Sequence, residues 1–415
     1  MNFQAFSPET ADVVPLEAPP GGLPSVVDTP AALADAVQAL AGGHGPVAAD
    51  SERASGFRYG AYAQLVQFFR RGTGLVLIDA VALPDLAAVS QALAGTEWVL
   101  HAASQDLPCL RDVGLEPQVL FDTELGARLL GWPQVGLAGV VARTLGLGLA
   151  KAYSAQDWSR RPLPQQWLNY AALDVLVLVD VRDAVARELE AAGKLDLARA
   201  EFQAVLEAPP HVPKPDPWRR TSGVHAIRDQ RRLAVVRELW QARDALAQKI
   251  DLAPGRVLPD AAIVAAAQAD LANPEQLKTI HPFGAKGQAK WLNRWWGAIQ
   301  RAKALPKGKL PSAKGPKHPG PGAVRSWAKR NPAAAARWDL VKAAVAQLSD
   351  AQAIPAENLM QPDLLRAVVF DAPADVPAAM AAGGARPWQV GLVAPLVERA
   401  IVEHPDQGNP PAQEQ

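Results

Sequence analysis

Four carboxylates and one tyrosine have the types and spacing that metal-dependent chemistry requires. Asp50 and Glu52 are two residues apart in the run VAADSE, and residues i and i+2 of a strand point to one face. Asp106 follows the apolar run EWVLHA and falls in the first turn of a predicted helix. Tyr170 and Asp174 are four residues apart in QQWLNYAALDV, a spacing that puts both on one helix face.

Converging carboxylates are the ligands that Mg²⁺ and Mn²⁺ prefer. Two such ions about 3.5–4 Å apart can activate a water and stabilise the leaving oxygen of a phosphodiester, and a nearby tyrosine can orient that water. Each motif alone has a simpler explanation. The D-x-E pair could mark a strand that reaches solvent, Asp106 could stabilise a helix N-terminus, and Y-x-x-x-D occurs by chance. Their order along the chain is what favours one joint site.

The elements that must position these residues alternate between strand and helix from Val26 to about Pro210. The predicted strands are 47–52, 61–69, 74–79 and 97–102, and the predicted helices are 83–94, 104–113, 123–131, 135–146 and 165–192. This alternation is typical of an α/β domain with a central sheet. Two carboxylates at the end of the buried strand 47–52 would be costly without partners or a metal.

With this order of motifs, residues 30–205 resemble the DEDDy 3′→5′ exonucleases, specifically ribonuclease D. The resemblance is carried by ADSERASGFRYGAYAQLVQFF, VLIDA, VLHAASQDLPCL, LFDTELGARLLG and DWSRRPLPQQWLNYAALDV. It implies a ribonuclease H-like α/β fold with a mixed sheet. It also implies that Asp50, Glu52, Asp106 and Asp174 bind two divalent ions, Mg²⁺ or Mn²⁺, and that Tyr170 positions the nucleophilic water.

Four further residues of this domain are candidates for nucleic-acid contacts. His101 and Gln67 could line the nucleotide cleft, although a hydrogen-bonded structural role explains His101 equally well. Lys151 and Arg161 flank the Asp-Trp pair of DWSRRPL and could touch the substrate backbone. Arg161 could equally be an ordinary residue at a helix entry. Asp122 is expected to cap the helix that follows it.

Two proline-rich breaks, APPHVPKPDPW (208–218) and LPKGKLPSAKGPKHPGPG (305–322), divide the chain. The expected segments are a flexible leader (1–25), the exonuclease domain (26–210), a first helical domain (211–303), a linker (304–322), a second helical domain (323–405) and a tail (406–415). The helical domains share related connections after a long first helix, IDLAPGRVLPD and QAIPAENLMQPD, which suggests a diverged repeat.

The first helical domain resembles the HRDC domain through AIRDQRRLAVVRELWQARDALAQKIDLAPGRVLPDAAI and KTIHPFGAKGQAKWLNRWWGAI. The second is expected to be a diverged HRDC-like domain. Within a predicted helix over 285–303, Lys286, Lys290 and Arg294 recur every four residues, so we expect one basic face that binds nucleic acid. The tryptophans of WLNRWW are expected in the core, with base stacking as the alternative.

The zero net charge conceals an uneven distribution. Residues 1–210 hold 14 Lys and Arg against 24 Asp and Glu, residues 211–330 hold 23 against 8, and residues 331–415 hold 5 against 10. A basic block favours a polyanionic partner because cationic side chains release counterions from phosphates. A solvated basic surface is the alternative.

Composition narrows the class of protein. Cys109 is the only cysteine, which excludes an internal disulfide and a cysteine-rich zinc site. No apolar run approaches 18 residues and the first residues do not form a signal peptide, so we expect no membrane association and a cytoplasmic location. We expect no nucleotide cofactor, and a monomer is the default oligomeric state.

The resulting hypothesis is a metal-dependent 3′→5′ exoribonuclease. It would trim structured RNA with a single-stranded 3′ end, such as a tRNA precursor, and release nucleoside 5′-monophosphates. One alternative is a 3′→5′ DNA exonuclease, because the same chemistry acts on either polymer. Another is a non-catalytic RNA-binding protein on an exonuclease scaffold, which the intact carboxylates disfavour.

Overall fold

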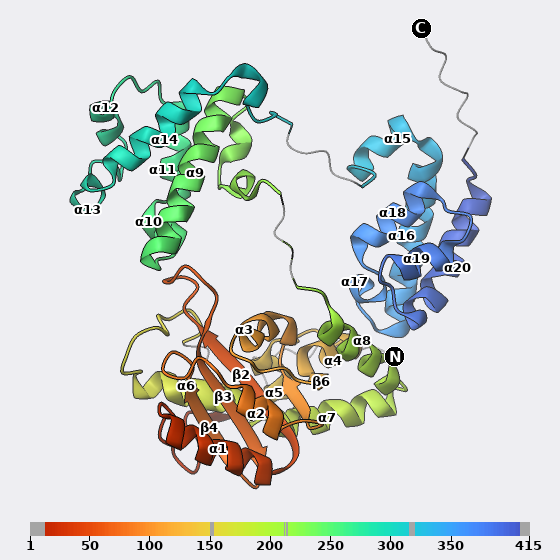
Figure 1. Ribbon diagram of the computed structural model, residues 1–415. Helices are drawn as coiled ribbons and strands as arrows, with labels where there is room; N and C mark the ends of the chain where they lie inside the picture. The colour runs from red at the N-terminus through yellow and green to blue at the C-terminus, as the bar shows by residue number, and fades with distance from the viewer. Residues whose placement is uncertain (1–12, 150–152, 211, 213–214, 315–319, 407–415) are drawn as a thin grey trace.

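The computed structural model describes residues 13–149, 153–210, 212, 215–314 and 320–406. An α/β unit is followed by two all-helical units (Figure 1). Among these residues no helix combines the length and apolar character that crossing a bilayer requires.

The α/β unit contains seven strands and eight α-helices within the described residues. The strands are β1 (Val14–Leu16), β2 (His44–Arg53), β3 (Ala63–Arg71), β4 (Gly74–Asp79), β5 (Glu97–Leu100), β6 (Val119–Asp122) and β7 (Leu147–Leu149). The helices are α1 (Pro30–Gly42), α2 (Ala87–Ala92), α3 (Leu107–Asp112), α4 (Thr123–Leu129), α5 (Leu137–Leu145), α6 (Gln165–Leu176), α7 (Leu178–Ala191) and α8 (Leu195–Glu207).

Five strands form one sheet in the order β4-β3-β2-β5-β6. β2, β3 and β4 are antiparallel neighbours, whereas β5 pairs parallel to β2 and β6 parallel to β5. The predicted mixed sheet is therefore confirmed. Side chains of β3 point alternately to the two faces of this sheet. Leu65 belongs to an apolar cluster with residues of α6, whereas Val66 and Phe68 belong to the main core with Leu40 of α1. Both faces are thus buried, with α6 on one of them.

Several elements differ from the sequence prediction. Strand β1 lies within the residues expected to be a loose leader, and it pairs in parallel with β7, which was also not expected. Helices α1 and α8 and strand β6 were missed as well. α1 begins after Thr29, whose hydroxyl accepts a hydrogen bond from the Ala32 N–H, with Pro30 in its first turn. The single helix predicted over 165–192 is two helices, separated at Val177.

From the long helix onward, the two helical units have similar but not identical orders of elements. The first has α9 (Gln230–Ile250), α10 (Pro254–Val257), α11 (Asp260–Gln268), α12 (Pro274–Lys278), α13 (Lys286–Ala289) and α14 (Leu292–Ala304). The second has α15 (Trp327–Arg330), α16 (Pro332–Gln352), α17 (Ala356–Leu359), α18 (Pro362–Asp371), α19 (Val376–Ala382) and α20 (Pro387–Glu403). The long helices α9 and α16 each have 21 residues and end on a left-handed residue, Asp251 or Ala353, both at φ 47°. This correspondence agrees with the suggested repeat.

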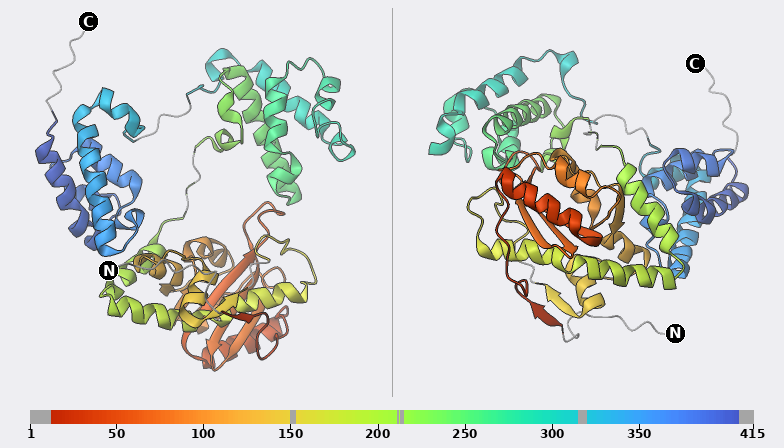
Figure 2. Two further views of the ribbon diagram at one scale, coloured as in Figure 1. Left: turned by 180° about the vertical axis from the view of Figure 1, so that it is seen from behind. Right: turned by 60° about the horizontal axis from the view of Figure 1, so that its bottom comes forward.

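The two helical units attach to the α/β unit in different ways. The first has its own apolar core, whereas the core of the second is continuous with that of the α/β unit. At the second junction, Arg386 and the indole N–H of Trp388 both donate to the buried carboxylate of Glu201 on α8. Figure 2 shows the units from two further sides, with the first helical unit beyond one end of the sheet.

Candidate active site

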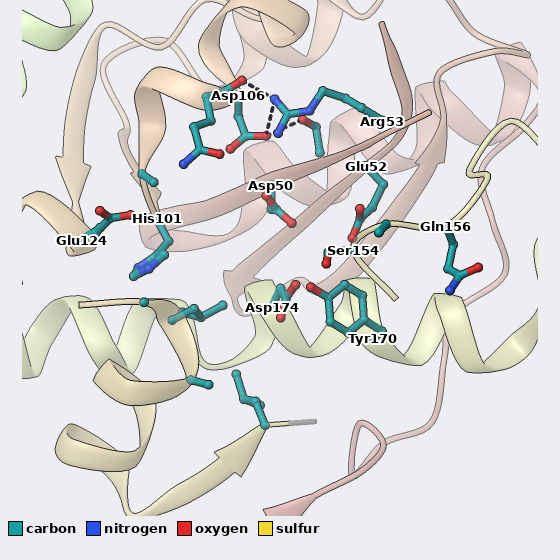
Figure 3. Close-up of a pocket in the computed structure, with 18 of the residues that line it drawn as sticks. Asp50, Glu52, Arg53, His101, Asp106, Glu124, Ser154, Gln156, Tyr170 and Asp174 are labelled. Carbon is teal, nitrogen blue, oxygen red and sulfur yellow. Dashed lines mark hydrogen bonds and ion pairs between the residues drawn. The ribbon is translucent and has the colours of Figure 1, made fainter. Parts of the chain in front are cut away.

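Asp50 and Glu52 lie near the end of β2 on the face that α6 covers. In the β2–β3 register Asp50 is opposite Gln67 and Glu52 is opposite Leu65, and Leu65 packs against α6 residues. α6 presents Tyr170 and Asp174 toward the two strand carboxylates (Figure 3). Carboxylate oxygens of Asp50, Glu52 and Asp174 all lie within 4.8 Å of one another. Three of the four predicted carboxylates therefore converge at one point.

Asp106 lies beside this cluster but is engaged in other contacts. It directly precedes α3, at the end of the turn that follows β5, and its side chain makes no capping hydrogen bond to that helix. Its Oδ1 accepts a hydrogen bond of 2.7 Å from the Ser51 hydroxyl and lies 3.4 Å from Nη1 of Arg53. Figure 3 shows Arg53 and Asp106 turned toward each other, with Asp50 between them and Asp174. Neither Arg53 nor Ser51 was predicted, although both are part of the run DSER that marked the site.

The electrostatics of the cluster favour a bound cation. Burial, and then the charges of Asp106 and Asp174, raise the pKa of Asp50 well above its usual value. Burial, and then the charges of Asp50 and Asp174, have the same effect on the pKa of Glu52. Burial raises the pKa of Asp174 to about 7, against the opposing effect of the Tyr170 hydroxyl. Three carboxylates that resist ionisation together would be stabilised as anions by a divalent ion, and their oxygens suit Mg²⁺ or Mn²⁺.

A cavity of about 610 Å³ opens over this cluster. Asp50, Glu52, Asp106, Tyr170 and Asp174 all contribute to its lining. Further wall residues come from three loops: Ser55, Gly56 and Phe57 after β2, Gly136 and Ala138 around the start of α5, and Ser154, Ala155 and Gln156 before α6. A cavity of this size accommodates a nucleotide-sized ligand next to the carboxylates.

Gln67 does not line the cavity, contrary to expectation. Its side chain is fully buried behind Asp50, and its Nε2 donates a hydrogen bond of 2.7 Å to Asp50 Oδ2. Gln67 therefore orients a carboxylate of the cluster.

His101 does line the cavity. Its Nδ1 lies 2.9 Å from the Thr123 hydroxyl, and its buried Nε2 has no partner among the described residues. Burial lowers the pKa of His101 to about 4, so the ring is neutral at pH 7. Both of the roles considered for His101 remain compatible with this position.

Arg161 is occupied by the protein itself. Its Nε and Nη2 donate to the two oxygens of Asp79 at 2.5 and 2.7 Å. Its remaining donors reach the carbonyl oxygens of Gln64, Trp158 and Arg160. All five N–H groups are thus used, so the expected contact with a substrate backbone is not supported. Lys151 lies outside the described residues.

The expected single basic helix face of the first helical unit is interrupted. α13 ends at Ala289 and α14 begins at Leu292, so Lys286, Lys290 and Arg294 do not lie along one continuous helix. Trp295 is fully buried, as expected, and Trp291 and Trp296 pack against the same core. Asp122 caps α4 as predicted, accepting hydrogen bonds from the N–H groups of Glu124 and Leu125.

The mixed sheet, the carboxylate cluster and the two helical units define a 3′→5′ exonuclease with appended helical domains. Residues 24–190 match the family described as 3′-5′ exonuclease, residues 232–299 match the HRDC domain, and residues 320–401 match the 3′ to 5′ exonuclease C-terminal domain. The second helical unit is thus matched under a description other than HRDC.

Similarity to individual proteins extends along most of the chain. The chain is 31% identical to ribonuclease D of Granulibacter bethesdensis, with 73% of this chain and 76% of the relative covered. A crystal structure of a protein from Bifidobacterium adolescentis is 38% identical and has a TM-score of 0.87, with 94% of this chain and all of that one covered. The crystal structure of Escherichia coli RNase D is 25% identical and has a TM-score of 0.65, with coverage of 92% and 99%. The chain belongs to the ribonuclease D family and is a 3′→5′ exoribonuclease.

Proposed function

We propose that the enzyme hydrolyses RNA one nucleotide at a time from the 3′ end by a two-metal-ion mechanism and releases nucleoside 5′-monophosphates. The observation that carries the proposal is the convergence of Asp50, Glu52 and Asp174 within 4.8 Å at the base of a nucleotide-sized cavity. Mg²⁺ or Mn²⁺ bound there would polarise the phosphate and lower the pKa of an attacking water.

Different side chains of the site would bind the ions, orient the ligands and orient the attacking water. Asp50, Glu52 and Asp174 would hold the ions, with Asp106 completing the set once one of its oxygens leaves Arg53. Gln67 fixes the orientation of Asp50. The Tyr170 hydroxyl lies beside Asp174 (Figure 3), where it can orient the water. Burial and the Asp174 charge raise the pKa of Tyr170, so this hydroxyl acts as a neutral hydrogen-bonding group and not as a base.

The substrate class is proposed from the relatives and from charge. The E. coli relative is described as an exoribonuclease involved in structured RNA processing. The block of residues 211–330, with 23 Lys and Arg against 8 Asp and Glu, could bind the body of such an RNA while its 3′ end enters the cavity. We therefore propose structured RNA, such as tRNA precursors, as the substrate and the cytoplasm as the location.

The test uses a 3′-tailed tRNA labelled at its 5′ end, with a DNA of the same sequence in parallel. We expect stepwise 3′ shortening of the RNA with Mg²⁺ or Mn²⁺, abolished by EDTA and by Asp50→Ala or Asp174→Ala, while the variants still bind RNA. Equal or faster shortening of the DNA would favour a DNA exonuclease. Shortening by Asp50→Ala at the wild-type rate would refute the site, and no metal-dependent shortening of either polymer would indicate a binding protein.

A further inference from the structure

The loop formed by residues 54–62 connects β2 to β3 and has two sides with different neighbours. On one side, Ser55, Gly56 and Phe57 form part of the wall of the catalytic cavity. On the other side, the loop contacts the first helical unit where α9 ends and α10 begins. Figure 1 shows this loop extending from the end of the sheet toward α10. It is therefore part of the catalytic site and part of a contact between domains.

Backbone groups of the loop are held directly by the helical unit. The Phe57 carbonyl accepts a hydrogen bond of 2.9 Å from the N–H of Ala253, and the Gly56 carbonyl accepts one of 2.7 Å from Nε of Arg256. The Arg256 guanidinium also lies 3.9 Å from the centroid of the Phe57 ring, a geometry that supports a cation–π interaction. Two consecutive wall residues thus depend on one arginine of the helical unit.

The next residues of the loop are held by two acidic side chains. Asp251 accepts a hydrogen bond of 3.2 Å from the N–H of Tyr59, and its other oxygen lies 3.4 Å from Arg58. The Tyr59 hydroxyl lies 3.2 Å from both carboxylate oxygens of Asp244. The Tyr59 ring also packs against the core of the helical unit.

Another part of the cavity wall, formed by residues 154–156, is linked to this contact between domains through Arg58. Nε of Arg58 donates a hydrogen bond of 2.8 Å to the Ser159 hydroxyl, which in turn donates to Asp157. The preceding residues Ser154 to Gln156 line the cavity. Arg58 therefore connects the helical unit to both loops that flank the Glu52 side of the site.

In the second helical unit, the end of the corresponding long helix contacts the α/β unit at a different place. There, Lys194 donates to the carbonyl oxygens of Gln352 and Ala353, at the end of α16, and Lys194 is not among the residues that line the cavity. In both units the end of the long helix contacts the α/β unit. Only in the first unit does this contact involve residues that line the catalytic cavity.

We propose that the first helical unit shapes the catalytic cavity, with Arg256, Asp251 and Asp244 acting as positioning residues for the loop of residues 54–62. This inference rests on the proposed function. It goes beyond RNA binding by the helical unit, because it requires an effect on substrates that occupy the cavity alone. If the wall is not held in place, a substrate must order it on binding, which lowers the apparent affinity.

The experiment compares a trinucleotide RNA, which fills little more than the cavity, with a 3′-tailed tRNA. The variant Arg256→Ala/Asp251→Asn removes the Arg256 contacts and the charge that pairs Asp251 with Arg58, and asparagine tolerates the left-handed backbone of position 251. We expect it to raise KM for the trinucleotide about three- to ten-fold, the size of the lost cation–π and hydrogen-bond contacts. The value of kcat should stay within about twofold, because the loop does not hold the carboxylates.

Two variants of the same domain provide the controls. Arg232→Ala removes an exposed arginine whose ion pair, with Asp270 at 3.4 Å, stays inside the helical unit, and it should leave KM for the trinucleotide unchanged. Reversing the charges of three basic residues, Lys286, Lys290 and Arg294, should weaken the reaction with the tRNA and not the reaction with the trinucleotide. Amide hydrogen exchange gives a readout independent of activity: residues 55–60 should exchange faster in Arg256→Ala/Asp251→Asn and at the wild-type rate in Arg232→Ala.

Unchanged trinucleotide KM in Arg256→Ala/Asp251→Asn would overturn the inference, whether or not exchange of the loop accelerates. A loss confined to the tRNA would do the same, because it would reduce the helical unit to an RNA-binding module. A wild-type protein that shortens neither RNA would refute the proposed function instead. That outcome is distinguishable, because loop exchange would still be faster in Arg256→Ala/Asp251→Asn than in wild type and Arg232→Ala.

Discussion

Arg53 and Asp106 form an ion pair at 3.4 Å beside the carboxylate cluster. The same Asp106 oxygen also accepts the Ser51 hydrogen bond. If Asp106 is the fourth ligand of the proposed metal site, this cationic side chain competes with the ion for Oδ1 of Asp106, and separating the pair would cost part of the free energy of metal binding.

Replacing Arg53 should therefore strengthen metal binding. We expect Arg53→Ala to bind Mn²⁺ about three- to ten-fold more tightly in a calorimetric titration, since a partly exposed ion pair contributes about 1 kcal/mol. Arg53→Lys should stay near wild type. Arg143→Ala serves as the control because Arg143 pairs with Glu188 at 3.7 Å, away from the cluster. Equal or weaker binding by Arg53→Ala would mean that the pair does not compete with the ion.

Tyr170 should contribute to the rate and not to metal affinity. Its hydroxyl lies beside Asp174 in Figure 3, and a residue that orients an attacking water typically contributes roughly 10²-fold. We expect Tyr170→Phe to lower kcat by about this factor while Mn²⁺ affinity stays within about twofold. Single-turnover kinetics and metal titration on the same preparation check both parts. An unchanged kcat would remove Tyr170 from the mechanism.

Much of the site could be predicted from local periodicity. The alternation of side chains on a strand places Asp50 and Glu52 together, and the four-residue spacing on a helix places Tyr170 beside Asp174. Gln67 could not be assigned in this way, because its contact with Asp50 depends on how β2 and β3 are paired. The role of Arg161 could not be decided from local sequence either, because its partner, Asp79, is 82 residues away in sequence.

The features of the fold that could not be predicted from the sequence have similar causes. Continuous helical sequence does not reveal the interruption between α13 and α14, at Lys290 and Trp291. The short strands β1 and β7, of three residues each, carry too little pattern to be recognised and exist through their mutual pairing. The contact of residues 54–62 with the helical unit is likewise a tertiary feature that local sequence does not encode.

Gln67 should affect catalysis without touching substrate. Its hydrogen bond to Asp50 at 2.7 Å orients a proposed metal ligand, and the loss of such support typically costs 10–100-fold in activity or affinity. We expect Gln67→Leu to lower kcat/KM at least about tenfold. Gln64→Leu, a change on the same strand, is the matched control and should remain within about threefold. Wild-type activity in Gln67→Leu would show that Asp50 needs no such support.

His101 should make stability depend on pH. Burial lowers the pKa of His101 to about 4 in the folded protein, from 6.5. The unfolded chain therefore takes up a proton as pH falls below 6.5, whereas the folded protein does so only near 4, and stability is lost across this window. We expect the stability difference between wild type and His101→Gln to shrink by about 2 kcal/mol between pH 7 and pH 5. Urea unfolding at both pH values measures it, and a constant difference would contradict the burial argument.

Arg161 should stabilise the fold and leave RNA affinity unaffected. Its guanidinium pairs with Asp79 through both oxygens and satisfies three carbonyl groups, so Arg161→Ala leaves a largely buried carboxylate without its main partner. We expect a loss of about 3 kcal/mol in the free energy of unfolding. Arg161→Lys should lose nearly as much, because an ammonium group cannot supply five donors in a plane. A phosphate contact predicts the opposite pattern, in which lysine retains RNA binding and alanine loses it. Urea unfolding and RNA titration of both variants, under conditions where each is folded, distinguish the two roles.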